Sequence, residues 1–202
     1  MSLYLGLDTS NYTTSAALFD SGAGEMWQAK KLLPVKPGEL GLRQSDAVFH
    51  HVRQLPEVLE KVRSQVRGSL AAVAASQRPQ QAAGSYMPCF LTGAGAAREI
   101  AAAAGISCRL FTHQQGHVAA ALYGAGRREL IGGRFLAFHV SGGTTDALLV
   151  EPDEEEIIRC QVVGRSLDLK AGQLVDRVGG LLGLSFPAGP EQDRLAQKAK
   201  GR

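Results

Sequence analysis

Residues 4–18 read YLGLDTSNYTTSAAL, and residues 135–149 read FLAFHVSGGTTDALL. The two stretches lie 131 residues apart (135 less 4) and align without a gap, sharing their Leu, Ser, Thr-Thr, Ala and Leu positions. In each copy an apolar run leads into a tight polar turn and a second apolar run, a pattern typical of a β-hairpin. A tip rich in hydroxyls and small residues offers N–H and O–H groups to an anion. Two facing copies therefore predict a clamp for a phosphorylated ligand.

The composition indicates a folded protein without a membrane segment. Of the 202 residues, 45% are hydrophobic and 20% are charged, which is enough for a core. The formal net charge of +3 is too small to predict nucleic-acid binding by itself. Three cysteines without ligand-like spacing favour a reducing compartment. No segment is long and apolar enough to span a membrane, and no signal peptide is visible, so we expect a cytoplasmic protein.

Hydrophobic periodicity around the first copy predicts a complete α/β lobe over residues 1–125. The order β-β-β-α-β-α-β-α implies a mixed sheet flanked by helices. Pro56 inside the first helix predicts a kink or a second helix start, and the segment 34–41, with Pro37 and Gly38, is expected to be a loop. The expected strands are 3–8, 14–20, 25–33, 69–76 and 107–112, and the expected helices are 46–66 (capped by Ser45), 94–104 and 114–124.

The second copy starts a second lobe, expected over residues 132–202. It should contain strands at 134–141, 145–151 and 156–163 and a helix at about 168–183. A lobe equal to the first would need roughly another 60 residues, taking the repeat offset as the lobe size. We therefore expect an α/β protein with duplicated lobes, the second incomplete. The free sheet edge of that lobe predicts a homodimer or a hetero-complex.

Two histidines follow the fifth predicted strand in the stretch His113-Gln-Gln-Gly-His117. At positions i and i+4 they share one helix face and can chelate one metal ion. The alternative is a pair of polar residues at a helix start. Gln114 and Gln115 occupy the middle positions and the glutamate of HExxH is absent, so a zincin-like protease is disfavoured. A third ligand, expected to be a carboxylate, must come from elsewhere.

The second hairpin tip consists of Ser141, Gly142, Gly143 and Thr144. Its Gly-Gly pair lets the backbone approach a ligand closely, although Gly-Gly also favours an ordinary hairpin turn. The same tip recurs in the first copy from Asp8 onward, which favours phosphate binding.

Acidic residues near both tips are further candidates. Asp8 can hold a cation or orient water, or it can simply cap a turn. Asp168, Gly172 and Asp176 are expected near one face of a helix, where a carboxylate could accept hydrogen bonds from a ribose or a small substrate. The alternative is an amphipathic surface helix with Asp168 near its N-terminus. Gly189, in a rigid Pro-Ala-Gly-Pro turn, could let an adenosine approach, but a plain loop is the simpler interpretation.

These motifs together resemble the glycoprotease family (Gcp/TsaD, historically O-sialoglycoprotein endopeptidase) within the actin-like ATPase superfamily. The resemblance spans about residues 3–190. It is carried by the histidine pair at 113–117, by Val-Ser-Gly-Gly at 140–143, and by Asp176 with a glycine thirteen residues later, Gly189.

The resemblance implies an actin-like ATPase fold and a set of site residues. His113 and His117 would bind a divalent metal, iron or zinc. The residues from Ser141 to Thr144, with Asp176 and Gly189, would bind ATP or an adenylate, and Mg²⁺ is a further expected ion. Asp8 and Ser10 would be catalytic. The implied reaction is transfer of a threonylcarbamoyl group from its adenylate to adenosine in tRNA, with tRNA reached through partner proteins.

The sequence departs from the family pattern in ways that keep alternatives open. The family's ETSCDET is here residues 8–14, DTSNYTT, so the two acidic residues after the cysteine are absent, and SGGHT is SGGTT with Thr144. A non-catalytic scaffold of TsaB type, which lacks the histidine pair, is the first alternative. A metallo-endopeptidase, as the older family name suggests, and a sugar kinase or ATPase of the same superfamily are less favoured.

Overall fold

The computed structural model describes residues 2–10, 12–35 and 42–199, and the chain forms two compact units, Met1–Ala121 and Leu122–Arg202. Pro37 and Gly38 of the expected loop lie outside the described residues, as do residues 200–202. Within the described part of the chain, no helix has the length and apolar character needed to cross a lipid bilayer.

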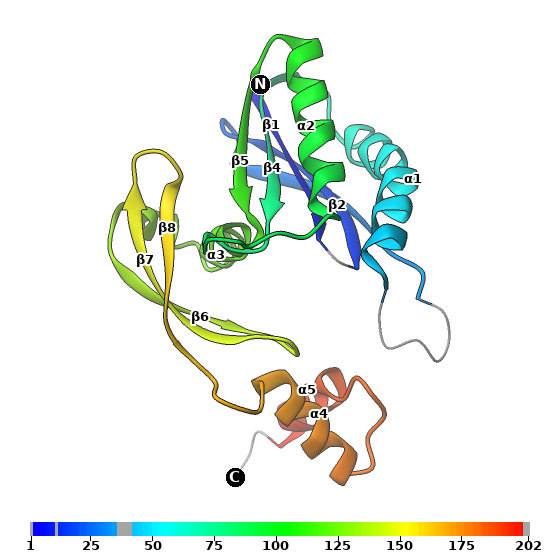
Figure 1. The fold of residues 1–202 in the computed structure, drawn as a ribbon, viewed down its shortest axis with the longest axis vertical. Helices are drawn as coiled ribbons and strands as arrows, with labels where there is room; N and C mark the ends of the chain where they lie inside the picture. Colours follow the sequence, from blue (N-terminus) through cyan, green and yellow to red (C-terminus); the bar gives the residue numbers. More distant parts are fainter. Residues whose placement is uncertain (1, 11, 36–41, 200–202) are drawn as a thin grey trace. The chain divides into compact units, whose positions relative to one another are not determined.

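The first unit is a mixed sheet covered by helices (Figure 1). Its elements are β1 (Ser2–Ser10), β2 (Thr13–Asp20), β3 (Glu25–Leu32), α1 (Gln44–Arg63), β4 (Ser69–Arg78), α2 (Phe90–Ala104), β5 (Ser107–Thr112) and α3 (His113–Gly124), which crosses the unit boundary. The described strands form a five-stranded sheet in the order β3-β2-β1-β4-β5. β1, β2 and β3 pair antiparallel, whereas β1, β4 and β5 pair parallel. Parallel neighbours require crossover connections, and α1 and α2 lie in those connections.

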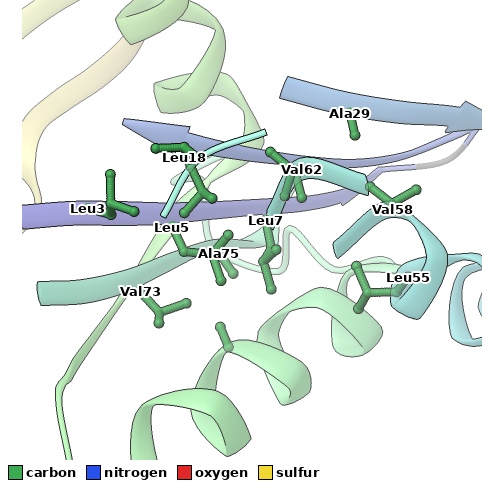
Figure 2. Packing of buried hydrophobic residues seen from close by; sticks show 13 residues of the cluster. Leu3, Leu5, Leu7, Leu18, Ala29, Leu55, Val58, Val62, Val73 and Ala75 are labelled. Atoms are coloured by element: carbon green, nitrogen blue, oxygen red, sulfur yellow. The ribbon is translucent and has the colours of Figure 1, made fainter. Parts of the chain in front are cut away.

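One hydrophobic core joins this sheet to α1 and α2. In β1 the alternate residues Leu3, Leu5 and Leu7 are buried, as the two-residue period of a strand requires. Figure 2 shows Val58 and Val62 of α1 among the side chains that pack with this strand. From α2 the core receives alanines, whose small side chains let the helix lie close to the sheet. The core thereby fixes β1, whose far end carries part of the candidate site.

The second unit contains a smaller sheet followed by two helices. Its elements are the 3-10 helix η1 (Arg128–Gly132), β6 (Phe135–Val140), β7 (Thr145–Asp153), β8 (Ile157–Arg165), α4 (Ala171–Leu181) and α5 (Gly189–Lys198). Among the described residues the strands pair antiparallel in the order β6-β7-β8.

The structure confirms the predicted order of strands and helices up to α4. Both copies of the repeat are hairpins, with Ser10 opposite Thr13 and Val140 opposite Thr145. Trp27, which has no partner motif in the sequence, packs against the core.

The predicted start of the first helix was wrong. α1 begins at Gln44, and the residue before it, Arg43, makes no side-chain cap, so Ser45 lies inside the helix rather than capping it. α1 also continues through Pro56 without a second start. A proline removes one hydrogen bond to the carbonyl four residues earlier. Here that residue is Val52, which is 56% exposed and so lies on the solvent side of α1.

The predicted bounds at the C-terminal end were also wrong. α4 begins at Ala171 because Lys170 is extended and donates its backbone N–H to Gln173 Oε1 at 3.4 Å. Asp168 therefore precedes the helix. Gly189 does not lie in a plain loop but opens α5, with Pro190 in the first turn, where a proline loses no helical hydrogen bond.

Candidate functional site

In the first unit, the end of β1 meets the start of α3. His113 Nδ1 lies 2.8 Å from Asp8 Oδ2, and the rings of His113 and His117 are 4.2 Å apart between centroids. β1 and β5 run in the same direction through their shared neighbour β4. Their C-terminal ends therefore lie at one edge of the sheet, the edge where open α/β sheets bind ligands.

Asp8 is an ionised carboxylate with a partner on each oxygen. Burial raises the pKa of Asp8, but the hydrogen bond and charge of His113, with hydrogen bonds from Ser10 and Ser76, outweigh burial and lower the pKa to about 2. The backbone N–H of Ser10 donates to Asp8 Oδ1 at 2.9 Å. An ionised Asp8 can only accept a hydrogen bond, so His113 donates from Nδ1.

The imidazole pair could supply two of the ligands of a metal ion. Imidazoles at i and i+4 are donors that zinc and iron accept. A carboxylate on the far ring nitrogen, as Asp8 is on His113, is the usual device that orients a metal-binding histidine. In residues 2–10, 12–35 and 42–199, no group of three or more His, Cys, Asp or Glu side chains is placed to hold a metal ion.

Gln115, between the two histidines, stabilises the start of α3. Gln115 Oε1 accepts the backbone N–H of Thr112 at 2.6 Å, and the backbone N–H of Gln115 donates to Thr112 Oγ1 at 3.1 Å. This reciprocal pair closes the first turn in the manner of a capping box. Gln115 is thus a helix-capping residue.

In the second unit, the hairpin tip closes on the hydroxyl of Ser141. The backbone N–H groups of Gly143 and Thr144 donate to Ser141 Oγ at 3.3 and 2.9 Å, and Ser141 N donates to Thr144 O at 2.7 Å. Gly142 and Gly143 are exposed. Successive N–H groups that converge on one point form an anion-binding concavity. In this structure the point on which the two N–H groups converge is occupied by the hydroxyl oxygen of Ser141.

Helix α4 links this tip to the other predicted residues of the second unit. The N–H of Gly172 donates to Ser141 O at 3.2 Å. One turn later, Asp176 Oδ1 accepts the N–H of Ala188 at 2.9 Å, directly before Gly189. Asp176 and Gly189, which the family resemblance pairs, therefore lie close together.

The predicted site residues thus fall into two groups, one in each unit. The first is Asp8, Ser10, His113 and His117; the second is Ser141, Gly142, Gly143, Thr144, Asp176 and Gly189. Asp168 was wrongly expected on the helix face of Gly172 and Asp176, because it precedes α4. That the two hairpin tips face each other as a phosphate clamp stays a prediction.

Sequence reasoning missed two supporting residues. Ser76 at the end of β4 contributes a hydrogen bond to Asp8. Thr145 Oγ1 accepts the N–H of Ala171 at 2.8 Å, which ties the start of α4 to β7. Nothing in the sequence marks Ser76, but Thr145 belongs to the repeated Thr-Thr, and that recurrence was a usable signal.

Comparison with known proteins identifies the family. A family model of TsaD, tRNA N6-adenosine threonylcarbamoyltransferase, matches residues 37–202. The chain belongs to this family. The resemblance to TsaD that the motifs carry is thereby confirmed.

Two TsaD relatives show how much of the family's length is present. The tRNA N6-adenosine threonylcarbamoyltransferase of Ralstonia pickettii is 31% identical over 199 residues, which are 96% of this chain and 54% of the relative. That of Methanopyrus kandleri is 30% identical over 180 residues, 88% of this chain and 49% of the relative. The chain therefore spans about half the length of the curated TsaD proteins that it matches.

Solved structures share the fold. Inorganic polyphosphate/ATP-glucomannokinase from Arthrobacter sp. strain KM is 12% identical, with a TM-score of 0.50 over 92% of this chain and 73% of the kinase. YeaZ from Pseudomonas aeruginosa is 16% identical, with a TM-score of 0.46 over 82% of this chain and 66% of YeaZ. At such identity the likeness to the kinase concerns the fold alone. It agrees with the α/β, actin-like ATPase fold that was expected, which this TsaD-family chain has.

Proposed function

We propose that this chain binds a metal ion and an adenine nucleotide and acts in cytoplasmic tRNA modification, in the transfer of a threonylcarbamoyl group from its adenylate to tRNA adenosine. Membership of the TsaD family supports the reaction class. The observation that carries the proposal is the contact of Asp8 with His113 beside His117, because such an arrangement prepares an imidazole for metal binding.

In the first unit, His113 and His117 would hold iron or zinc. A metal ion there supplies positive charge that polarises an oxygen of a bound acyl or phosphoryl group. Asp8 keeps the proton of His113 on Nδ1, so the lone pair stays on Nε2. Ser10 lies beside Asp8 and is the proposed hydroxyl donor toward the substrate.

In the second unit, the Ser141 tip would bind the phosphate of ATP, with its Mg²⁺, or of an adenylate. The N–H groups of Gly143 and Thr144 already converge on Ser141 Oγ, so rotation of the Ser141 side chain about χ1 would free two donors for an anion. Asp176 would accept hydrogen bonds from the ribose or substrate, and Gly189 would leave room for the adenosine.

The test is elemental analysis of the purified protein together with nucleotide titration. We expect iron or zinc in the wild type, loss of the metal in His117→Ala, and retention of the metal in His50→Ala, which removes a histidine from α1. Asp8→Asn should keep the metal but weaken its affinity by about 10- to 100-fold, because an amide orients the imidazole less firmly. Absence of metal in the wild type, together with unchanged nucleotide affinity in His117→Ala, would refute the proposal.

The alternative function is a non-catalytic scaffold of TsaB type. The observation in its favour is that Tyr12 and Thr13 stand where the family has two acidic residues. A scaffold would carry no iron or zinc, so the same elemental analysis distinguishes the two proposals.

A protein partner, either a second copy or a paralogue, is also proposed. β6 is an edge strand of the described sheet, and Leu136, Phe138 and Val140 on one of its faces are exposed. Apolar edge strands without charged residues favour pairing with another chain. A monomer in sedimentation experiments at micromolar concentration, alone and with candidate paralogues, would contradict this.

A further inference from the structure

Gly172 leaves no room for a side chain between α4 and the Ser141 tip. A Cβ atom built on Gly172 would lie 2.6 Å from Gly142 N and 2.8 Å from Gly142 Cα and the carbonyl carbon of Ser141. These are backbone atoms, which cannot rotate away as a side chain can. The glycine is therefore required here for space, so that helix backbone can touch loop backbone.

Gly179 leaves no room for a side chain near the other end of α4, where its nearest neighbours are side-chain atoms. A Cβ atom there would lie 2.1 Å from Ala188 Cβ and 2.6 Å from Gln192 Nε2. Gln192 Nε2 itself donates to Val175 O at 2.6 Å. The start of α5, including Gly189, is thus held against α4 at this glycine.

Gly172, Asp176 and Gly179 stand at positions i, i+4 and i+7, which share one face of a helix. Asp176 lies between the two glycines and holds the N–H of Ala188. From these contacts we infer that α4 is a spacer, and that Gly172 and Gly179 are positioning residues. Gly172 sets the distance from the Ser141 tip to Asp176, and Gly179 sets the distance from Asp176 to Gly189. The ligand for which this spacing matters, a nucleotide that spans tip and carboxylate, rests on the proposed function.

A methyl group at Gly172 would force the tip and α4 apart. Ordinary contact begins at 3.4 Å, so the 2.6 Å approach must open by about 0.8 Å. Gly180 provides a matched control, because it lies in the same helix and a Cβ atom there meets nothing within 4 Å.

The experiment compares ATP and adenosine affinities by calorimetry in the wild type, Gly172→Ala and Gly180→Ala. A displacement near 1 Å can weaken a positioned interaction by up to about 100-fold. We expect Gly172→Ala to weaken ATP binding at least about tenfold while adenosine binding changes less than about twofold. Gly180→Ala should change neither. Equal ATP affinity in folded Gly172→Ala and wild type would overturn the inference.

Gly179→Ala is the second variant and decides the matter if Gly172→Ala does not fold. It should weaken both ATP and adenosine binding, because it displaces Gly189 from Asp176. Unchanged affinity for both ligands in folded Gly179→Ala would overturn the inference.

Hydrogen exchange separates this inference from the proposed function. If the wild type binds no ATP, the nucleotide proposal fails, and exchange of the amides in residues 141–145 and 171–172 then tests the spacer by itself. Faster exchange in Gly172→Ala than in Gly180→Ala supports the spacer. Identical exchange in both variants refutes it.

Discussion

Lowering the pH from 7 to 5 should destabilise the first unit by about 2 kcal/mol, because unfolding releases a buried neutral imidazole. His51 of α1 is fully buried, and its Nδ1 lies 2.8 Å from Thr14 Oγ1. Thr14 donates its hydroxyl proton to Gln54 Oε1 at 3.0 Å, and Gln54 Nε2 donates to Leu32 O at 3.1 Å. Thr14 therefore accepts the Nδ1 proton of His51, whose Nε2 is left buried without a hydrogen-bond partner.

The magnitude follows from the pKa of His51. Burial lowers it from 6.5 to about 4, against the opposing charge of Asp8 and with a further lowering by His50. Between these values the unfolded state binds the proton and the folded state does not, so stability falls as the pH falls. From pH 6.5 to pH 5 the loss covers 1.5 pH units at about 1.4 kcal/mol each, or about 2 kcal/mol. Below pH 4 the loss levels off at about 3.5 kcal/mol.

The Asp8 carboxylate does not titrate between pH 7 and pH 5. The pKa of Asp8 is lowered from 3.8 to about 2, so its contribution is present above pH 3.8 and is lost only as the pH falls toward 2. Stability lost between pH 7 and pH 5 therefore reports on the buried imidazole rather than on the Asp8 carboxylate.

The assay is urea unfolding at pH 7 and pH 5, followed by the fluorescence of Trp27, the single tryptophan of the chain, which packs against the first unit's core. His51→Asn keeps a donor near the Nδ1 position but cannot titrate. We expect it to be less stable than the wild type at pH 7 yet to lose about 2 kcal/mol less on acidification. His50→Asn controls for removal of a partly exposed imidazole. Parallel pH dependence in the wild type and His51→Asn would refute the reasoning.

Three further substitutions have expected effects on the free energy of unfolding. Gly93→Ala would place a Cβ atom 2.9 Å from Thr9 Oγ1 and should cost about 1–3 kcal/mol in urea unfolding; an unchanged midpoint would contradict the packing argument. Gly105→Ala forces a side chain into a left-handed residue (φ 65°) at the end of α2, so a loss of about 1 kcal/mol is expected, and a gain in stability would count against it. Lys31→Ala removes an exposed ion pair with Glu57 and should change stability by less than about 1 kcal/mol at any salt concentration; a larger, salt-dependent loss would show that exposure has been misjudged.

The sequence alone was sufficient for the strands and α-helices up to α4, but not for their ends and not for α5. Alternation in β1 and the spacing of apolar residues in α1 are strong local signals, and both elements formed where expected. The residue at which a helix begins is set by the backbone conformation there, which residue type alone does not predict. Ser45 is a good cap by type, yet the chain is already helical at Gln44. Gly189 is a turn residue by type, yet Ala188 precedes a new helix there.

The candidate site was predictable in its members but not in its contacts. His113 and His117 were recognisable as a pair because they are four residues apart. The contact of Asp8 with His113 joins residues 105 positions apart, and it depends on the parallel pairing of β1, β4 and β5. Likewise, a glycine is required at position 172 only because the backbone of the Ser141 tip lies so close to it. Strand pairing and close backbone approach are tertiary properties, so residue type gives no direct sign of them.

The two copies of the internal repeat share a hairpin and a threonine that forms a hydrogen bond to a helix, but they do not share a buried surface. The hydroxyl of Thr14 forms a hydrogen bond with His51 of α1. The hydroxyl of Thr145, at the same repeat position, accepts a hydrogen bond from the backbone at the start of α4. Burial differs between the copies: Leu7 is 3% exposed, whereas Phe138, at the matching position, is 73% exposed. The hydrogen bond from the hairpin threonine to a helix is present in both copies, because it needs only the hairpin and that helix. Burial of the strand side chains depends instead on the elements that pack against the face of the sheet, so a repeated sequence does not guarantee it.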